Sequence, residues 1–178
     1  MARTAPARSK RVTVGEQFPT LLLRGLNDEP VQIPDPTGAL THLQFRRFAG
    51  CPVCNLHLRS VVVFHSTAAE LRKYQDDMPF AVVGDPDKDL YRRFGVEAST
   101  KALRLAAWRA LPGGYWHAIK TAIAKRRSPL PASPTNGNLG LPADLLIGPD
   151  GRILAAKYGS HAYDQWTVDE ILATARQQ

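Results

Sequence analysis

Continuous apolar runs constrain the fold of this chain more than any other feature of its sequence. They are SVVVFHS at 60–66, FAVVGD at 80–85 and ADLLI at 143–147, and none alternates between apolar and polar residues as a half-solvated strand does. Such runs are typical of strands that are buried on both faces of a sheet. The stretch HLQFRRF at 42–48 is a further predicted strand.

Helix signals lie between and after these runs. Glu70 completes a capping box with Ser66 or Thr67 as the N-cap, and the next helix ends at Gly95. The last helix, predicted over 167–178, begins with another Thr-x-x-Glu capping box. Strands that alternate with helices indicate an α/β protein.

The remaining segments predict a mixed sheet within one domain. Residues 148–151, Gly-Pro-Asp-Gly, form a turn between two antiparallel strands within 141–159. Upstream, 12–25 is predicted to be an extended lead-in, and 31–40, which is punctuated by Pro and Gly, a hairpin-like stretch. A chain of 178 residues has ordinary single-domain size, and we assign 12–178 to one domain.

The net charge of +7 is concentrated in two segments. Residues 1–11 hold four basic residues and no acid, and we expect a mobile basic tail there. The segment 98–143 holds seven basic residues and no acid, whereas the rest of the chain holds 12 basic and 16 acidic residues. The body of the protein is therefore mildly acidic, and its overall charge is no argument for nucleic-acid binding.

Both cysteines of the chain stand in the motif Cys51-Pro-Val-Cys54, where a predicted strand leads into a predicted helix. A helix N-terminus presents free N–H groups and a positive dipole end, which favour thiolate over thiol. Pro52 suits the first helical position, and Arg46 and Arg47 add positive charge just upstream. Cys51 is then the nucleophile, and Cys54 can resolve its mixed disulfide from one turn away.

Other interpretations of the motif remain. The two thiols can be buried as small apolar side chains, or Cys51, Cys54 and His57 can belong to a structural zinc site. That site needs a fourth ligand and normally a second cysteine pair, so we expect no metal. A single C-x-x-C among alternating strands and helices is typical of a thioredoxin-like redox motif. Pro142 supports that interpretation, because in the thioredoxin fold a cis-proline ahead of this strand lies against the dithiol, although a trans proline can also begin a strand.

Five segments of the chain, the Cys51–Cys54 motif among them, resemble the peroxiredoxin-like proteins of the alkyl hydroperoxide reductase/thiol-specific antioxidant (AhpC/TSA) superfamily. The matching segments follow the order of that superfamily and are FRRFAGCPVCNLHLR (45–59), VVVFHS (61–66), FAVVGDPDKDLYRRFGVE (80–97), GLPADLLIGPDGRILAAKYG (140–159) and HAYDQWTVDEIL (161–172). The resemblance implies a thioredoxin-like fold, a mixed central sheet flanked by helices. It also implies Cys51 as the nucleophile, Cys54 as the resolving cysteine and Pro142 as the cis-proline.

Two departures limit what the resemblance implies. Typical members carry Pro-x-x-x-Thr-x-x-Cys, whose Pro and Thr shape the peroxide pocket, and Gln44 and Phe48 stand at those places here. The hydroxyl that would bond a peroxide is absent, whereas dithiol–disulfide exchange needs only the cysteine pair. The crossover 49–60 is also short, so either the cysteine helix is truncated or residues are missing from the printed sequence.

The basic insert, with its linker, covers 98–139 and splits at 112–114 into two expected helical segments. A surface helical hairpin whose lysines and arginines face water is the simplest interpretation. The functional alternatives are a lid over the cysteines, a surface for homodimerisation and a contact with anionic membranes, of which we expect the membrane contact least. No nucleic-acid partner is expected, because the insert has no recognised nucleic-acid motif.

Together these features predict a thiol–disulfide oxidoreductase that serves redox homeostasis through its Cys51–Cys54 dithiol. We expect it to be cytoplasmic, because the N-terminus lacks the apolar region of a secretory signal, and to need no organic cofactor. Its substrate would be a disulfide, and thioredoxin or a low-molecular-weight thiol would restore the dithiol. The enzymatic alternative is a thiol peroxidase in which Cys51 becomes a sulfenic acid and Cys54 condenses with it. The non-enzymatic alternative is a redox sensor or binding module that acts through the basic insert.

Overall fold

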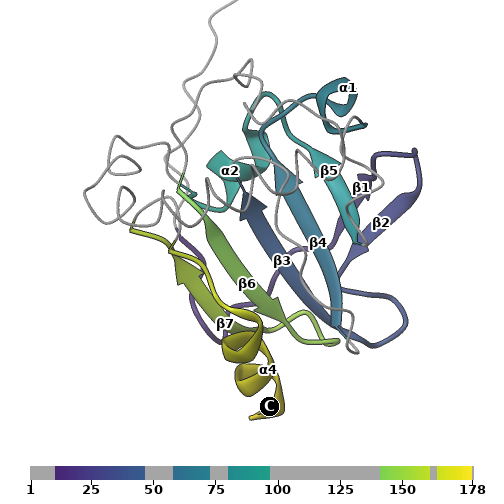
Figure 1. Ribbon diagram of the computed structural model, residues 1–178. Helices are drawn as coiled ribbons and strands as arrows, with labels where there is room; N and C mark the ends of the chain where they lie inside the picture. The colour runs from purple at the N-terminus through teal and green to yellow at the C-terminus, as the bar shows by residue number, and fades with distance from the viewer. Residues whose placement is uncertain (1–10, 47–57, 73–79, 97–140, 161–163, 178) are drawn as a thin grey trace, which may run out of the picture.

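A five-stranded sheet in the order β5-β4-β3-β6-β7 forms the centre of the protein (Figure 1). The computed structural model describes residues 11–46, 58–72, 80–96, 141–160 and 164–177. The strands of the central sheet are β3 (Leu40–Arg46), β4 (Leu58–Phe64), β5 (Ala81–Gly84), β6 (Ala143–Ile147) and β7 (Ile153–Tyr158).

The sheet is mixed, as predicted. β3 and β4 run parallel from the pair Leu40–Leu58 to the pair Arg46–Phe64, and β4 runs parallel to β5. β6 pairs antiparallel with both β3 and β7. The predicted turn at 148–151 joins β6 to β7, with Gly151 in the left-handed region at φ 82°.

β4 begins earlier than the sequence predicted. The apolar run that predicts this strand begins at Ser60, but Leu58 and Arg59 also belong to β4. Pairing with β3 explains the difference, because the ladder that starts at Leu40 and Leu58 satisfies backbone groups that a short helix would leave open. The predicted cysteine helix itself lies in 47–57, outside the described residues.

The N-terminal hairpin is built from other residues than expected. β1 (Leu21–Arg24) pairs antiparallel with β2 (Pro30–Ile33), so that the stretch 31–40 contributes a strand and a loop instead of a hairpin of its own. Residues 25–29 connect the two strands, with Asp28 in the left-handed conformation at φ 62°. The connection therefore places an Asp in the left-handed conformation, whereas the sequence predicted a turn with Pro and Gly within 31–40.

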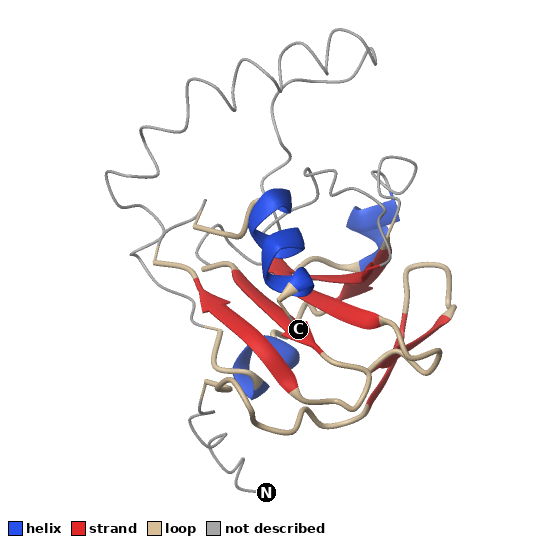
Figure 2. Cartoon of the chain, turned by 90° about the horizontal axis from the view of Figure 1, so that it is seen from below, coloured by secondary structure: helices blue, strands red, loops and turns tan. Residues whose placement is uncertain are grey.

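Both predicted capping boxes are present. Thr67 Oγ1 accepts a hydrogen bond from Glu70 N at 3.3 Å, and Thr167 Oγ1 accepts one from Glu170 N at 3.2 Å. Gly95, with φ 66°, follows the second helix as predicted. The described helices are α1 (Ala68–Leu71), α2 (Asp89–Arg93) and α4 (Val168–Arg176). α1 and α4 lie on one face of the sheet and α2 lies on the other (Figure 2).

Alternate residues of β3 define the two faces of the sheet. Leu43 and Phe45 join the larger hydrophobic core, together with apolar side chains of β4, β6 and α2. His42, Gln44 and Arg46 point to the opposite face, and each of them is buried. Polar side chains on a buried sheet face need hydrogen-bond partners, and His42 has one in Asp144 of β6.

Candidate functional site

The candidate site lies at the carboxyl ends of the parallel strands, which are Arg46 in β3, Phe64 in β4 and Gly84 in β5. Ligands of open α/β sheets bind outside this edge, because the loops that leave the strands converge there. Cys51 follows Arg46 by five residues in the sequence. Cys51, Cys54, Pro52 and Arg47 all lie outside the described residues, so their predicted roles stay predictions.

Tyr91 of α2 links the ends of the two central strands. Its hydroxyl lies 2.7 Å from the carbonyl oxygen of Arg46 and 2.9 Å from that of Val63, and it is placed to donate to both. The ring is buried and packs edge-on against Phe45, with 5.1 Å between the ring centroids. Burial raises the pKa of Tyr91 far above its usual value, so the phenol stays protonated and acts as a donor.

Asp85 and His65 complete the polar surroundings of Tyr91. The Asp85 carboxylate, just after β5, accepts hydrogen bonds at 2.9 Å from the backbone N–H groups of Asp89 and Leu90, and thereby caps α2. Burial raises the pKa of Asp85, although the hydrogen bonds from the helix N–H groups oppose that shift. His65, just after β4, is fully buried and faces the Tyr91 ring edge-on at 6.0 Å.

A buried polar chain crosses the sheet on the face opposite Tyr91, and we use this name for Asp144, His42, Gln44 and Arg46. His42 Nε2 lies 3.1 Å from Asp144 Oδ1, and the side chains of both are 1% exposed. The Gln44 amide nitrogen lies 3.0 Å from His42 Nδ1, and Arg46 Nε donates to Gln44 Oε1 at 3.0 Å. The chain therefore connects a carboxylate on β6 to a guanidinium at the end of β3.

The orientation of the Gln44 amide in the buried polar chain follows from the groups on either side of it. Arg46 has donors alone, so the Gln44 oxygen must face Arg46 and the Gln44 NH₂ must face His42. The Gln44 NH₂ lies within hydrogen-bond distance of both ring nitrogens of His42, 3.0 Å from Nδ1 and 3.2 Å from Nε2. The Trp166 backbone N–H donates to the other Asp144 oxygen at 3.2 Å, so both carboxylate oxygens have partners.

Sequence reasoning did not find the buried polar chain as a unit. It noted Arg46 as upstream charge and Gln44 as a departure from a family motif, and it gave no role to His42 or Asp144. Positions 42, 44 and 46 were the available signal, because three polar residues at the period of a strand share one face. The partner on β6 could not be inferred, since it lies 102 residues away in the sequence.

Pro142 begins the path into β6, as expected, but its peptide bond is not the predicted one. Among the described residues the cis peptide bond joins Ile33 to Pro34, and the Leu141–Pro142 bond is trans. Pro142 is buried, and its carbonyl accepts a hydrogen bond from Gly159 N at 2.9 Å. A trans proline that needs no N–H partner suits this position ahead of a strand, so the cis-proline prediction is wrong.

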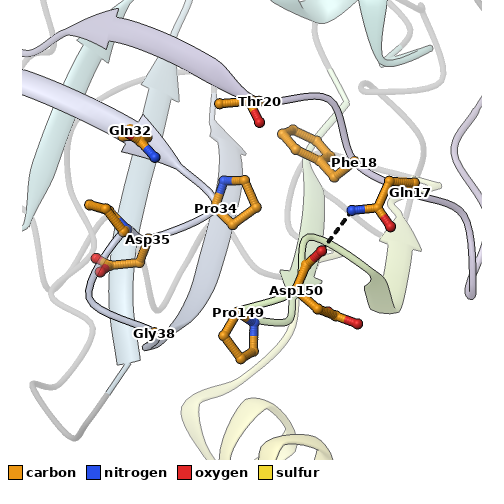
Figure 3. A pocket seen from close by; sticks show the side chains of 10 residues that line it. Gln17, Phe18, Thr20, Gln32, Pro34, Asp35, Gly38, Pro149 and Asp150 are labelled. Carbon is orange, nitrogen blue, oxygen red and sulfur yellow. Dashed lines mark hydrogen bonds between the residues drawn. The ribbon is translucent and has the colours of Figure 1, made fainter.

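A concave region lies at the other end of β3. It is a cavity of about 300 Å³ formed by the loop before β3, the β6–β7 turn and the N-terminal segment (Figure 3). Phe18 and Pro34 contribute apolar walls, and Gln17 Nε2 donates to the Asp150 carbonyl oxygen at 2.7 Å across the rim. The cavity is remote from the carboxyl ends of the parallel strands and is not part of the candidate site.

Among the described residues, no group of three His, Cys, Asp or Glu side chains could hold a metal ion. Within the same part of the chain, no helix is long and apolar enough to cross a membrane.

Comparison with known proteins identifies the fold. No family model matches the chain, and no curated protein sequence matches it. A thiol peroxidase from Chromobacterium violaceum superposes with a TM-score of 0.59 at 11% identity, over 95% of this chain and 89% of that one. A peroxiredoxin-like protein from Aquifex aeolicus gives 0.60 at 10% identity, over 96% and 90% of the two chains. A peroxidoxin from Mycobacterium tuberculosis gives 0.58 at 12% identity, over 92% and 96%.

These likenesses extend over nearly the whole chain, so the protein has a peroxiredoxin-like thioredoxin fold. That fold is the one implied by the resemblance of its sequence segments. At these identities the comparison establishes the architecture alone.

Proposed function

We propose that the protein is a thiol-dependent oxidoreductase of the peroxidase type, with Cys51 as its nucleophile and Cys54 as its resolving cysteine. The observation that supports this most is the peroxiredoxin-like fold over nearly the whole chain, combined with a dithiol motif that begins five residues after the end of β3. A buried guanidinium, Arg46, ends that strand, and positive charge near a thiol favours the thiolate.

The proposed reaction has two steps in the protein. The Cys51 thiolate attacks the terminal oxygen of a hydroperoxide, the O–O bond breaks, and the released alkoxide takes a proton to leave as an alcohol or water. Cys51 is now a sulfenic acid. The Cys54 thiol attacks its sulfur, an S–S bond forms and water leaves. Two electrons from an external thiol, either thioredoxin or a low-molecular-weight thiol, then restore the dithiol.

The remaining predicted residues have supporting roles in this proposal. Pro52 would occupy the first turn of the cysteine helix, where its missing N–H costs nothing. Arg47 would add to the positive potential around Cys51, and Pro142 would line the groove through which the substrate approaches.

Thiol–disulfide exchange is the second candidate, and one observation favours it. The threonine and proline of the peroxide pocket are replaced by Phe48 and Gln44. The Gln44 amide is engaged at both ends, by Arg46 and by His42, so it is not available to bond a peroxide. Exchange would proceed with the same two cysteines, since the Cys51 thiolate attacks a disulfide and Cys54 releases the mixed disulfide.

Stopped-flow mixing of the reduced protein with hydrogen peroxide, and separately with a small-molecule disulfide, distinguishes the two candidates. The peroxidase proposal expects peroxide to oxidise Cys51 far faster than it oxidises a free thiol at the same pH. Cys51→Ser should abolish this reaction, and Cys54→Ser should retain the first step while losing the intramolecular disulfide. Peroxide oxidation at the free-thiol rate, together with rapid reduction of the disulfide, would replace the proposal with the second candidate.

A further inference from the structure

We propose that the C-terminal helix is a detachable cover over the polar face of β3, and that it opens as a unit, ahead of global unfolding, to give water access to His42. The cover consists of α4 and its lead-in 164–167, and α4 lies on one face of the sheet (Figure 2). The polar face is the one on which β3 presents His42 and Gln44, both buried. This inference is independent of the proposed function, because it uses neither cysteine.

The helix buries little apolar surface of its own. All nine residues of α4 are described, and Ile171 alone is buried, at 2% exposure, whereas Val168 and Leu172 are half-buried. A helix of this length is not stable by itself in water, so its contacts with the rest of the protein decide whether it forms. Regions with few buried apolar contacts open at a lower free energy than the core. The attachment of α4 therefore depends on contacts outside its apolar stripe.

Polar side chains of β6 and β7 supply those contacts at the lead-in. The Trp166 N–H donates to Asp144 Oδ2 at 3.2 Å, and Lys157 Nζ donates to the Gln165 carbonyl oxygen at 3.2 Å. Lys157 also forms an ion pair with Asp164, with 3.3 Å between Nζ and Oδ1. Hydrogen bonds to charged groups are stronger than those between neutral groups, so they are the main attachment of a helix that buries a single side chain.

Asp144 joins the cover to the sheet. Its Oδ1 lies 3.1 Å from His42 Nε2, while its Oδ2 accepts the Trp166 N–H. The side chains of His42 and Asp144 are each 1% exposed, and the Trp166 ring lies beside the His42 ring with 6.3 Å between the centroids. The closed cover thus shields this pair from water.

The chemistry of the covered face favours opening. Exposing apolar side chains to water costs free energy in proportion to their area, whereas His42, Gln44 and Asp144 gain water as a hydrogen-bond partner when the cover leaves. On the opposite face, Leu43 and Phe45 belong to the larger hydrophobic core together with side chains of α2. The two faces of β3 therefore differ: α4 can leave locally, whereas α2 stays in place until the sheet unfolds.

Native-state hydrogen exchange followed by NMR, at a series of low denaturant concentrations, tests the opening. We expect the backbone amides of 171–176 to be at least tenfold less protected than those of 61–63 in β4. Their exchange should depend little on denaturant, because local opening exposes little surface. Equal protection and equal denaturant dependence in α4 and β4 would overturn the inference, since the helix would then open by global unfolding alone.

Two variants separate the attachment of the cover from global stability. Lys157→Met removes the contacts with Gln165 and Asp164, so the exchange of the α4 amides should accelerate about tenfold. Thr67→Ala is the control, because the α1 capping box is lost only when the sheet unfolds. It should lower the protection of β4 and leave α4 exchange unchanged. The inference fails if Lys157→Met does not alter α4 exchange, or if Thr67→Ala accelerates α4 as much as β4. Asp164→Asn carries the test if Lys157→Met does not fold.

Modification of His42 by diethyl pyrocarbonate, located by peptide mass spectrometry, tests what the cover protects. The rate should rise in Lys157→Met by the same factor as α4 exchange, and it should stay unchanged in Thr67→Ala. A constant rate at His42, with accelerated α4 exchange, would show that the helix does not control access to this residue and would overturn that part of the inference. Either failure leaves the proposed function standing, because no measurement here involves Cys51.

Discussion

Removing the hydroxyl of Tyr91 is the sharpest test of how the carboxyl ends of the central strands are held together. In Tyr91→Phe the ring remains, with its edge-on contact to Phe45 at 5.1 Å, so the change removes one oxygen and leaves the apolar packing in place. The hydroxyl serves the carbonyl oxygens of Arg46 and Val63, at 2.7 and 2.9 Å, and both acceptors lose this partner.

The expected cost follows from that geometry. A typical hydrogen bond contributes about 1 kcal/mol net, and a buried acceptor left without its partner costs about 1–3 kcal/mol. Because one proton is shared between two carbonyls, we expect Tyr91→Phe to lower the free energy of unfolding by about 1–2 kcal/mol. For a chain of this size that corresponds to a fall in Tm of roughly 2–8 °C.

Urea denaturation followed by circular dichroism measures this cost, and the m value should stay constant because the surface exposed on unfolding is the same.

Tyr158→Phe is the matched control. Its half-buried hydroxyl accepts from Val12 N at 3.0 Å and donates to the Phe94 carbonyl at 2.8 Å, on another part of the sheet. It should also destabilise the protein, because it too removes a hydroxyl that serves two backbone partners. A loss below about 0.3 kcal/mol in Tyr91→Phe would refute the reasoning, since it would mean that the bridge contributes nothing beyond the ring.

Three further predictions follow from the packing and the charges. Thr167→Ala should destabilise the protein by about 1 kcal/mol through loss of the α4 capping box, whereas Thr174→Ala, within the same helix, should cost much less in the same urea titration. Phe45→Ala should cost about 3–5 kcal/mol, because its side chain is fully buried at the centre of the larger core, and a cost below about 1 kcal/mol would contradict that placement. Hydrogen bonds from Ser160 lower the pKa of Asp164 below 3.8, so its carboxylate stabilises the fold above that pH and the stabilisation is lost as the pH falls further. Asp164→Asn should therefore lower the free energy of unfolding at neutral pH more than in acid, and an equal loss at both would contradict the assignment.

The parts of the fold that sequence predicts well are those encoded by neighbouring residues. The apolar runs at 60–66, 80–85 and 143–147 fall in β4, β5 and β6, because a strand inside a sheet that is covered on both faces buries adjacent apolar side chains. The capping boxes at Thr67 and Thr167 fixed the starts of two helices, since the interacting groups lie three residues apart.

The parts that sequence missed depend on partners far along the chain. Leu58 joined β4 because β3 offered a backbone partner, and its local pattern suits a helix equally well. The hairpin turned at residues 25–29 because strand pairing, not the density of Pro and Gly, selected the connection. The link from His42 to Asp144 required knowing that β6 lies beside β3, which follows from the fold and not from either residue.

The candidate site also has a part that the sequence predicts and a part that only the structure shows. Spacing and residue type predicted Cys51 and Cys54 as the reactive pair, and that prediction stays open because the dithiol motif lies outside the described residues. The Tyr91 bridge and the buried polar chain came from the structure, and both converge on Arg46. Buried polar groups of this kind are formed by pairing across strands, so a sequence pattern can indicate their presence but not their partners.

Chemical trapping of the oxidised thiol tests the central claim most directly. Reduced Cys54→Ser protein is treated with one equivalent of hydrogen peroxide in the presence of a sulfenic-acid-specific nucleophile, and the modified residue is identified by mass spectrometry. The account predicts an adduct at Cys51 in this variant, and in the parent an intramolecular Cys51–Cys54 disulfide that forms without the adduct. No adduct at Cys51, with both thiols of the parent still reduced, would contradict it.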